Sequence, residues 1–143
     1  MNALVNSIAK KYISWDRNAE DVGFISLTKK AIKNIFGYLS DDEIKEVATS
    51  VGSTVPRDLL MLNFNTVTFD NIVLLLEIWN ERFGKVRHTV SDSKHQFTIY
   101  HEINETFSKY IAFLHKAMAE DLMFNIKITN VTESAFSFLV EKK

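Results

Sequence analysis

Large apolar side chains recur at helical intervals over the first 22 residues. They follow one another at steps of four, four, three, four and three positions: Leu4, Ile8, Tyr12, Trp15, Ala19 and Val22. A repeat close to 3.5 residues places them on one stripe, which is typical of a helix that packs along another helix. We therefore expect residues 1–22 to form a long helix. Because a single apolar stripe at a free chain start buries little surface by itself, we expect this helix either to dimerise through Leu4, Ile8, Tyr12, Trp15 and Ala19 or to continue an upstream segment.

Cap residues predict the next two helices. Gly23 ends the first helix, and Ser26 is suited to cap a second one. Ser40 and Glu43 form a capping box for a third helix, in which Ile44, Val47, Ala48 and Val51 are expected to face inward. Gly52 is expected in the C′ position, just after that helix ends.

Two more helices are predicted before residue 85. Pro56 is tolerated in a first helical turn, so Val55 and Pro56 begin a short helix that Leu59, Leu60 and Leu62 anchor in the core. Thr68 or Asp70 begins a longer helix with a wide apolar face, and Gly84 ends it.

The apolar period then changes from 3.6 to 2. Alternation over 85–90 and 95–101 predicts two strands around a turn at 91–94, and a helix follows from Asn104 to Leu122. A second hairpin is predicted from 124–128 and 136–140. The expected fold is therefore α+β, with about five helices followed by a ββαββ unit. The unit forms an antiparallel four-stranded sheet with helices packed on it. We divide the chain into residues 1–22, the dimerising helix, and 23–143, the α+β regulatory or ligand-binding domain.

Composition narrows the functional classes. Apolar residues make up 46% of the 143 residues, and eleven of them are Phe, which is typical of a globular protein. A net charge of −1 argues against a polycationic surface for nucleic acids, and zero Cys excludes disulfides and thiolate chemistry. No apolar run has membrane-spanning length and no signal peptide is visible, so we expect a cytoplasmic protein without a membrane partner.

The four histidines are the candidates for acid–base or metal chemistry near neutral pH. In the first hairpin, the turn places His88 opposite Phe97, so that His95 is its diagonal neighbour on the same face, roughly 7 Å away. A metal would need a third ligand, and no carboxylate alternates onto that face. We therefore predict half-buried or solvated imidazoles and no metal. His115 is expected at the edge of the apolar face of its helix.

His101 lies where a strand passes into a helix, and two interpretations remain open. In the first, it braces the turn through a hydrogen bond to the backbone. Alternatively, it contacts an effector at the rim of a pocket between the sheet and the following helix, together with Trp79 and Tyr110. Glu77, amid an apolar run, is expected to pair with Arg82 or Lys85.

Motifs for enzymatic chemistry are missing from the sequence. There is no Gly-rich phosphate loop, no Ser/His/Asp grouping and no paired carboxylate at a strand end. We therefore predict a non-enzymatic protein without a cofactor.

One family resemblance covers most of the chain. It is carried by NALVNSIAKKYISWDRNAEDVGFIS, SLTKKAIKNIF, EVATSVGSTVPRDLLMLNF, FDNIVLLLEIW and FTIYHEINETFSKYIAFLHKAM. These segments resemble archaeal regulators in which a ribbon-helix-helix unit precedes an α/β second domain. The first segment resembles the second helix of that DNA-binding unit. The chain starts without the strand and first helix that would enter the major groove, so we expect either a part of such a regulator or a member that does not bind DNA.

The resemblance implies that the chain is the oligomerisation and effector domain of a transcriptional regulator and that it forms a homodimer. DNA is a partner only if an upstream strand and helix are present. The alternative is a small-molecule sensor, because a helical block followed by ββαββ is similar in element order to haem–nitric-oxide sensor and vinyl-reductase-like domains. Such a sensor would hold haem or another hydrophobic ligand between its helices and its sheet.

Overall fold

Helices occupy the first 80 residues, and the strands follow. The computed structural model describes residues 2–143, without the side chains of residues 10, 14, 15 and 18–20. The helical part consists of α1 (Ala3–Lys11), a π-helical turn (Tyr12–Asp16), α2 (Arg17–Val22), α3 (Lys29–Gly37), α4 (Asp41–Gly52), α5 (Val55–Phe64) and α6 (Phe69–Asn80). The second part consists of β1 (Lys85–Ser91), β2 (Lys94–Tyr100), α7 (Glu105–Leu122), β3 (Asn125–Val131) and β4 (Ala135–Glu141).

All four strands form one antiparallel sheet, which confirms the α+β class. The order in the sheet is β1-β2-β4-β3, so the last strand of the chain lies inside the sheet and β3 forms an edge. The order in space thus differs from the order of the strands along the chain. The predicted register of the first hairpin is confirmed, with His88 opposite Phe97, and Phe97 in turn lies opposite Phe138 of β4.

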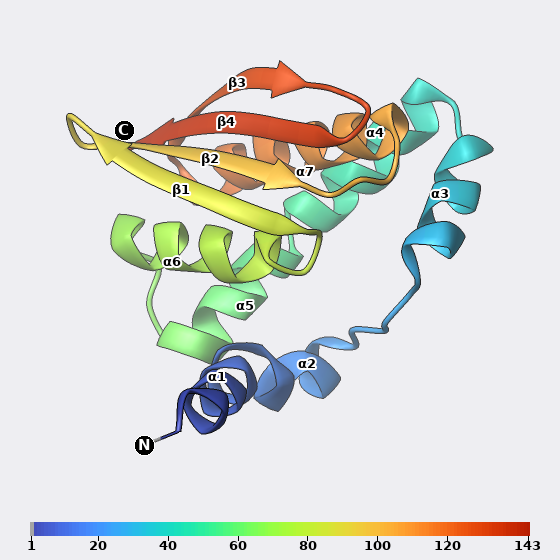
Figure 1. The fold of residues 1–143 in the computed structure, drawn as a ribbon. Coiled ribbons are helices and arrows are strands. Elements are labelled where there is room, and N and C mark those ends of the chain that lie inside the picture. Colours follow the sequence, from blue (N-terminus) through green and yellow to red (C-terminus); the bar gives the residue numbers. More distant parts are fainter. Residues whose placement is uncertain (1) are drawn as a thin grey trace.

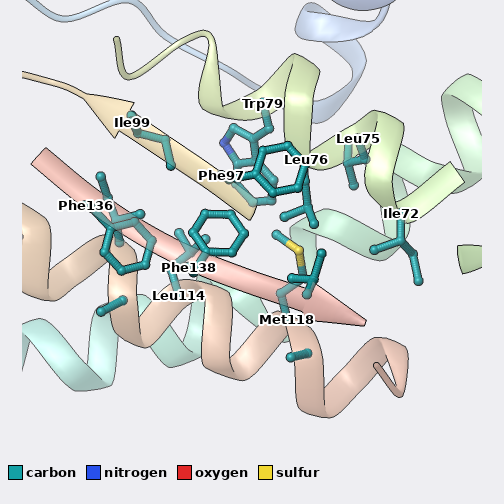
Figure 2. Packing of buried hydrophobic residues seen from close by; sticks show 14 of the residues in the cluster. Ile72, Leu75, Leu76, Trp79, Phe97, Ile99, Leu114, Met118, Phe136 and Phe138 are labelled. Atoms are coloured by element: carbon teal, nitrogen blue, oxygen red, sulfur yellow. The ribbon is translucent and has the colours of Figure 1, made fainter. Parts of the chain in front are cut away.

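The core lies between one face of the sheet and helices α6 and α7; in Figure 1, α6 runs below the strands and α7 lies behind them. Figure 2 shows the rings of Phe136 and Phe138 on the side of Leu114 and Met118 of α7, and the ring of Phe97 beside Leu76 of α6. All of these side chains are fully buried. Burial of this kind stabilises a fold by about 25 cal/mol per Å² of apolar surface. The alternation of apolar residues along β2 and β4 predicts that this face of the sheet is buried.

Helix α4 covers α7 on the side away from the sheet. The capping box of Ser40 and Glu43 begins α4 as predicted, and Ile44 and Ala48 are buried. The prediction that Gly52 follows the end of this helix is wrong, because Gly52 is its last helical residue and Ser53 is the C-cap. A Cβ atom at Gly52 would overlap the carbonyl oxygen of Leu114, so the glycine allows the two helix backbones to approach closely.

Several local predictions are corrected by how the helices pack. Thr28, rather than Ser26, caps α3 by accepting a hydrogen bond from the N–H of Ala31. Val47 and Leu62 were expected inside but are exposed, because α4 and α5 each bury only a narrow face. Gly84 does not end α6, which stops at Asn80; it lies against the backbone of Tyr100, where a side chain would collide with the neighbouring strand.

The predicted first helix is present but not regular. A π-helical turn interrupts it at Tyr12–Asp16, and Gly23, with φ of +79°, follows its last residue. A π turn adds a residue to the helical period, so a 3.5-residue stripe cannot continue through it without a shift. The predicted stripe can be followed from Leu4 through Ile8 to Tyr12, whereas the side chains of Trp15 and Ala19 lie outside the described part.

Among residues 2–143, no single helix is long and apolar enough to cross a bilayer. The stretches 41–64 and 69–80 together reach the required length and composition, but they are bent by 106° relative to each other.

Candidate functional site

His101 is completely buried at the junction of β2 and α7. Its Nδ1 accepts a hydrogen bond from the N–H of Ile103 at 3.1 Å. Its Nε2 lies 2.6 Å from Oγ of Ser108, and the Ser108 hydroxyl lies 2.6 Å from the carbonyl oxygen of Thr132. The neutral imidazole carries one proton, and because Nδ1 is an acceptor, that proton must be on Nε2. The chain of donors therefore runs from His101 to Ser108 and on to Thr132.

This network favours the bracing interpretation of His101. It ties the start of α7 to the turn before β4, and both ring nitrogens are used within the protein. Burial lowers the pKa of His101 to about 4, and the positive charge of Lys29 acts in the same direction. A neutral, fully bonded imidazole has no donor or acceptor left for an effector.

Trp79 and Tyr110 do not meet His101 around a common cavity. Phe107 separates them, with its ring centroid 5.2 Å from that of His101 and 5.9 Å from that of Tyr110. Trp79 joins this group only through Phe83, at 6.4 Å. Burial raises the pKa of Tyr110 to about 12. The space in which a ligand was expected, between the sheet and α7, is occupied by core side chains (Figure 2).

His88 and His95 do converge, as the hairpin register predicts. Nε2 of His88 lies 3.0 Å from Nδ1 of His95, and the His88 ring stacks on Phe97 with centroids 4.2 Å apart. Burial lowers the pKa of His88; the charge of Glu77 opposes this shift, and His95 adds to it. Among residues 2–143, no group of three or more His, Asp or Glu side chains is placed to hold a metal ion.

His115 belongs to a buried polar pair that the sequence analysis missed. Its Nδ1 donates to the carbonyl of Ile111 at 2.8 Å, and its Nε2 accepts from Nδ2 of Asn80 at 3.0 Å. The same amide donates to the carbonyl of Leu76 at 2.7 Å, so that the pair joins α6 to α7 inside the core. Burial lowers the pKa of His115 to about 4. The signal was present, because Asn80 and His115 each stand four positions after an inward residue, Leu76 and Ile111.

Two hollows lie beside the N-terminal helices. A groove of about 450 Å³ separates α1 from α6, and half-buried Glu77 lines it together with Lys11 and Arg82. The second hollow, which we name the linker cavity, measures about 340 Å³. It is lined by Asp16, Phe24, Ile25, Ser26, Leu27, Ile32, Trp79, Arg82 and Phe83. Trp79 is therefore the predicted ligand residue that faces a cavity, although this cavity is not the one expected.

The apolar side chains of α1 and of the start of the π-helical turn are largely exposed. Leu4 is 64% exposed, Ile8 60% and Tyr12 56%. Val5 and Ile13 beside them are also exposed, so the helix presents a continuous apolar strip to solvent. Contiguous patches of this kind on a folded domain generally mark contact surfaces.

No family model and no curated protein matches the chain. The relationship to ribbon-helix-helix regulators, based on the segments quoted above, therefore stays a prediction. The function has to be inferred from the surfaces and cavities themselves.

Proposed function

We propose that this chain is a non-enzymatic oligomerisation and effector domain of a ribbon-helix-helix type transcriptional regulator, and that it forms a homodimer through α1. The single observation that carries the proposal is the exposure of Leu4, Ile8 and Tyr12 on one strip. Residues four positions apart lie on the same face of an α-helix, so Leu4, Ile8 and Tyr12 form one strip that a partner helix can cover. A second copy of the same helix supplies a complementary strip by symmetry.

The charge pattern of α1 supports a protein partner over a nucleic acid. The chain has a net charge of −1, and α1 combines its apolar strip with few charged groups. Phosphate binding relies on several Lys or Arg contacts, which such a surface does not supply. DNA recognition by the regulator would therefore come from a strand and helix placed before this domain.

Light scattering on the purified chain tests the dimer. Ile8→Asp places an unpaired charge in the proposed seam, which costs several kcal/mol and should raise the dimer dissociation constant by about 100-fold or more. Ile35→Asp is the matched control, because Ile35 is a half-exposed isoleucine on α3, away from α1. We expect the first variant to be monomeric and the second to remain a dimer. A dimer that survives Ile8→Asp, or a monomeric parent protein, contradicts the proposal.

A gel-shift assay tests the assignment of DNA binding. The chain alone is expected to bind duplex DNA weakly and without sequence preference at physiological salt, because it has neither a recognition ribbon nor excess positive charge. Sequence-selective binding under these conditions would show that residues 2–143 recognise DNA themselves. It would contradict the proposal that an upstream strand and helix do so.

The alternative function, a small-molecule sensor, is supported by one observation. The linker cavity is lined mainly by apolar side chains and borders Trp79. A sensor of this kind would hold its ligand beside the first helix instead of between the sheet and α7. Native mass spectrometry of freshly purified protein would detect both the bound ligand and the oligomeric state in one measurement.

A further inference from the structure

Strand β1, yellow in Figure 1, forms one edge of the sheet and is the more regular of the two edges. Because the strand order is β1-β2-β4-β3, β1 and β3 each have a neighbouring strand on one side only. All seven residues of β1 pair with β2 without a shift, whereas the pairing of β3 with β4 shifts between Ile128 and Asn130. An irregularity of this kind protects an edge from further pairing. β1 is therefore the edge that can accept another strand.

The turn after β1 determines which backbone groups of the strand face outward. Asp92 and Ser93 form a two-residue turn, and both have positive φ, 49° and 64°, as a type I′ turn requires. In such a hairpin the two residues that flank the turn exchange both hydrogen bonds, and hydrogen-bonded pairs then alternate with non-hydrogen-bonded pairs. The N–H and C=O groups of Val86, His88 and Val90 therefore point away from β2. They are the backbone groups that an added strand would bind.

The side chains of β1 make one face of this edge positively charged. Lys85 and Arg87 are exposed, and within residues 2–143 neither forms an ion pair or a side-chain hydrogen bond. They line a hollow of about 920 Å³. Lys29 and Glu102 also line it, but these two form an ion pair with each other at 3.5 Å. The uncompensated charge at the hollow is therefore that of Lys85 and Arg87.

The opposite face of β1 is uncharged and partly apolar. His88 is half-buried there, and Val90 is 59% exposed. Burial lowers the pKa of His88, and the charge of Glu77 of α6 partly opposes this shift, so a negative charge already acts on this side. An added strand is therefore expected to carry acidic side chains on the face of the two cations and apolar side chains on the face of Val90.

Two other occupants fit this edge less well. A second copy of β1 would bring the Lys85 and Arg87 side chains of both copies together, and like charges on neighbouring strands are destabilising. A nucleic acid would place phosphates beside these cations, but it has no repeating N–H and C=O groups to match the backbone of β1. A peptide strand with acidic side chains complements both the backbone and the charges.

We propose that β1 binds an extended acidic segment of a partner protein, which adds a fifth strand to the sheet. The backbone of this segment would pair with Val86, His88 and Val90. Its acidic side chains, at every second position, would lie beside Lys85 and Arg87. The site is on the sheet, whereas the proposed dimer forms through α1, so neither proposal depends on the other.

Isothermal titration with two acetylated peptides tests the charge of the partner. The peptides Gly-Glu-Val-Glu-Val-Glu-Gly and Gly-Lys-Val-Lys-Val-Lys-Gly share their length and apolar positions and differ in the sign of their charge. The parent protein should bind the acidic peptide about tenfold more tightly or better. Arg87→Glu should remove this preference. Lys127→Glu makes the same change at an exposed position of the other edge strand, β3, and should bind both peptides like the parent.

Two changes to the backbone test whether the peptide adds as a strand. Val90→Pro removes an outward-facing N–H at an exposed edge position, where proline is tolerated, and should weaken binding of the acidic peptide about tenfold or more. Val90→Thr keeps this N–H and should bind like the parent. An acidic peptide with N-methylated valines keeps every charge but loses the donors that face β1, so it should not bind.

Amide hydrogen exchange gives a readout in the unmodified protein. The acidic peptide should slow the exchange of the N–H groups of Val86, His88 and Val90 and leave those of β3 unchanged. Absence of saturable binding of the acidic peptide overturns the proposal, as does equal binding of its N-methylated form. Equal affinity of Arg87→Glu and Lys127→Glu for the acidic peptide overturns it as well. Displacement of the peptide by a thymidine oligonucleotide that binds more tightly would assign the edge to nucleic acid instead.

Discussion

Gly52 of α4 lies directly against the carbonyl group of Leu114 of α7. A Cβ atom at position 52 would overlap that carbonyl oxygen and would also stand 3.0 Å from the Cβ atom of Ala117. Glycine is normally unfavourable inside a helix by about 0.5–1 kcal/mol. Here this cost is offset by the close packing of α4 on α7, which in turn supports the sheet from below.

Gly52→Ala should therefore destabilise the protein, although alanine is the better helix former. Overpacking of a tight contact costs about 1–3 kcal/mol, and the atom that would have to move belongs to the backbone. Gly37→Ala is the matched control, because no atom lies within 4 Å of its Cβ position and its φ is not left-handed. That substitution should stabilise the protein slightly, by about 0.5 kcal/mol. Chemical denaturation measures both changes, and equal effects would contradict the packing role of Gly52.

Ser108 is expected to be important for stability because it relays the hydrogen bond of His101. Ser108→Ala would leave the Nε2–H of His101 and the carbonyl of Thr132 without their partner in a buried place. An unsatisfied buried group costs about 1–3 kcal/mol, so the melting temperature should fall by several degrees. Ser53→Ala, which changes an exposed hydroxyl, should alter it little. A small effect of Ser108→Ala would argue against the brace.

His101→Ala extends the same test to the question of ligand contact. The substitution also removes the acceptor of the Ile103 N–H, so it should lower the melting temperature of the unliganded protein at least as much as Ser108→Ala. If His101 instead contacted an effector, the unliganded protein would melt as before. The loss would then appear only in stabilisation by the ligand.

His88 and His95 provide a measurable interaction on the first hairpin. Their ring nitrogens lie 3.0 Å apart, and diagonal pairs on one face of a sheet contribute up to about 1 kcal/mol. A double-mutant cycle with His88→Gln and His95→Gln should give a coupling energy of about 0.5–1 kcal/mol in the free energy of unfolding. Strictly additive effects would show that the imidazoles do not interact in solution.

Much of the local structure was predictable because its causes are local. The capping box of Ser40 and Glu43, Asn104 as the cap of α7 and the turn between β1 and β2 each depend on a few neighbouring residues. The contact of Gly52 with Leu114 was not predictable in this way. It depends on which two helices pack together, and the sequence pattern of either helix alone does not reveal its partner.

In the candidate site, too, features with local causes were predictable and features that depend on distant residues were not. The hairpin register predicted that His88 and His95 would meet, because a turn sets both positions. It could not show that the Ser108 hydroxyl would accept from His101 and donate to the carbonyl of Thr132, since Thr132 comes next to Ser108 only when β4 joins β2. The sequence pattern does not reveal the linker cavity, because Ser26 is as well suited as Thr28 to cap a helix. Because Thr28 is the cap, residues 24–27 lie outside the helix and line the cavity.

The two buried histidines should make stability depend on pH. His101 and His115 have pKa values of about 4 in the folded protein, and the ordinary value for an unfolded histidine is about 6.5. Between these values the unfolded chain binds protons that the folded protein excludes. Each histidine thus contributes stability that is fully present above pH 6.5 and is lost as the pH falls toward 4, by about 1.4 kcal/mol per pH unit at most.

Denaturation curves between pH 7.5 and 4.5 would measure this slope. His115→Gln should be less stable at neutral pH, because the hydrogen bond from Asn80 is disturbed, but its stability should fall less steeply on acidification. Gly37→Ala, which changes no titratable group, should keep the slope of the parent. If the free energy of unfolding of His115→Gln falls with pH as steeply as that of the parent protein, protonation of His115 does not cause the pH dependence. The interpretation of Asn80 and His115 as a neutral pair between α6 and α7 would then be wrong.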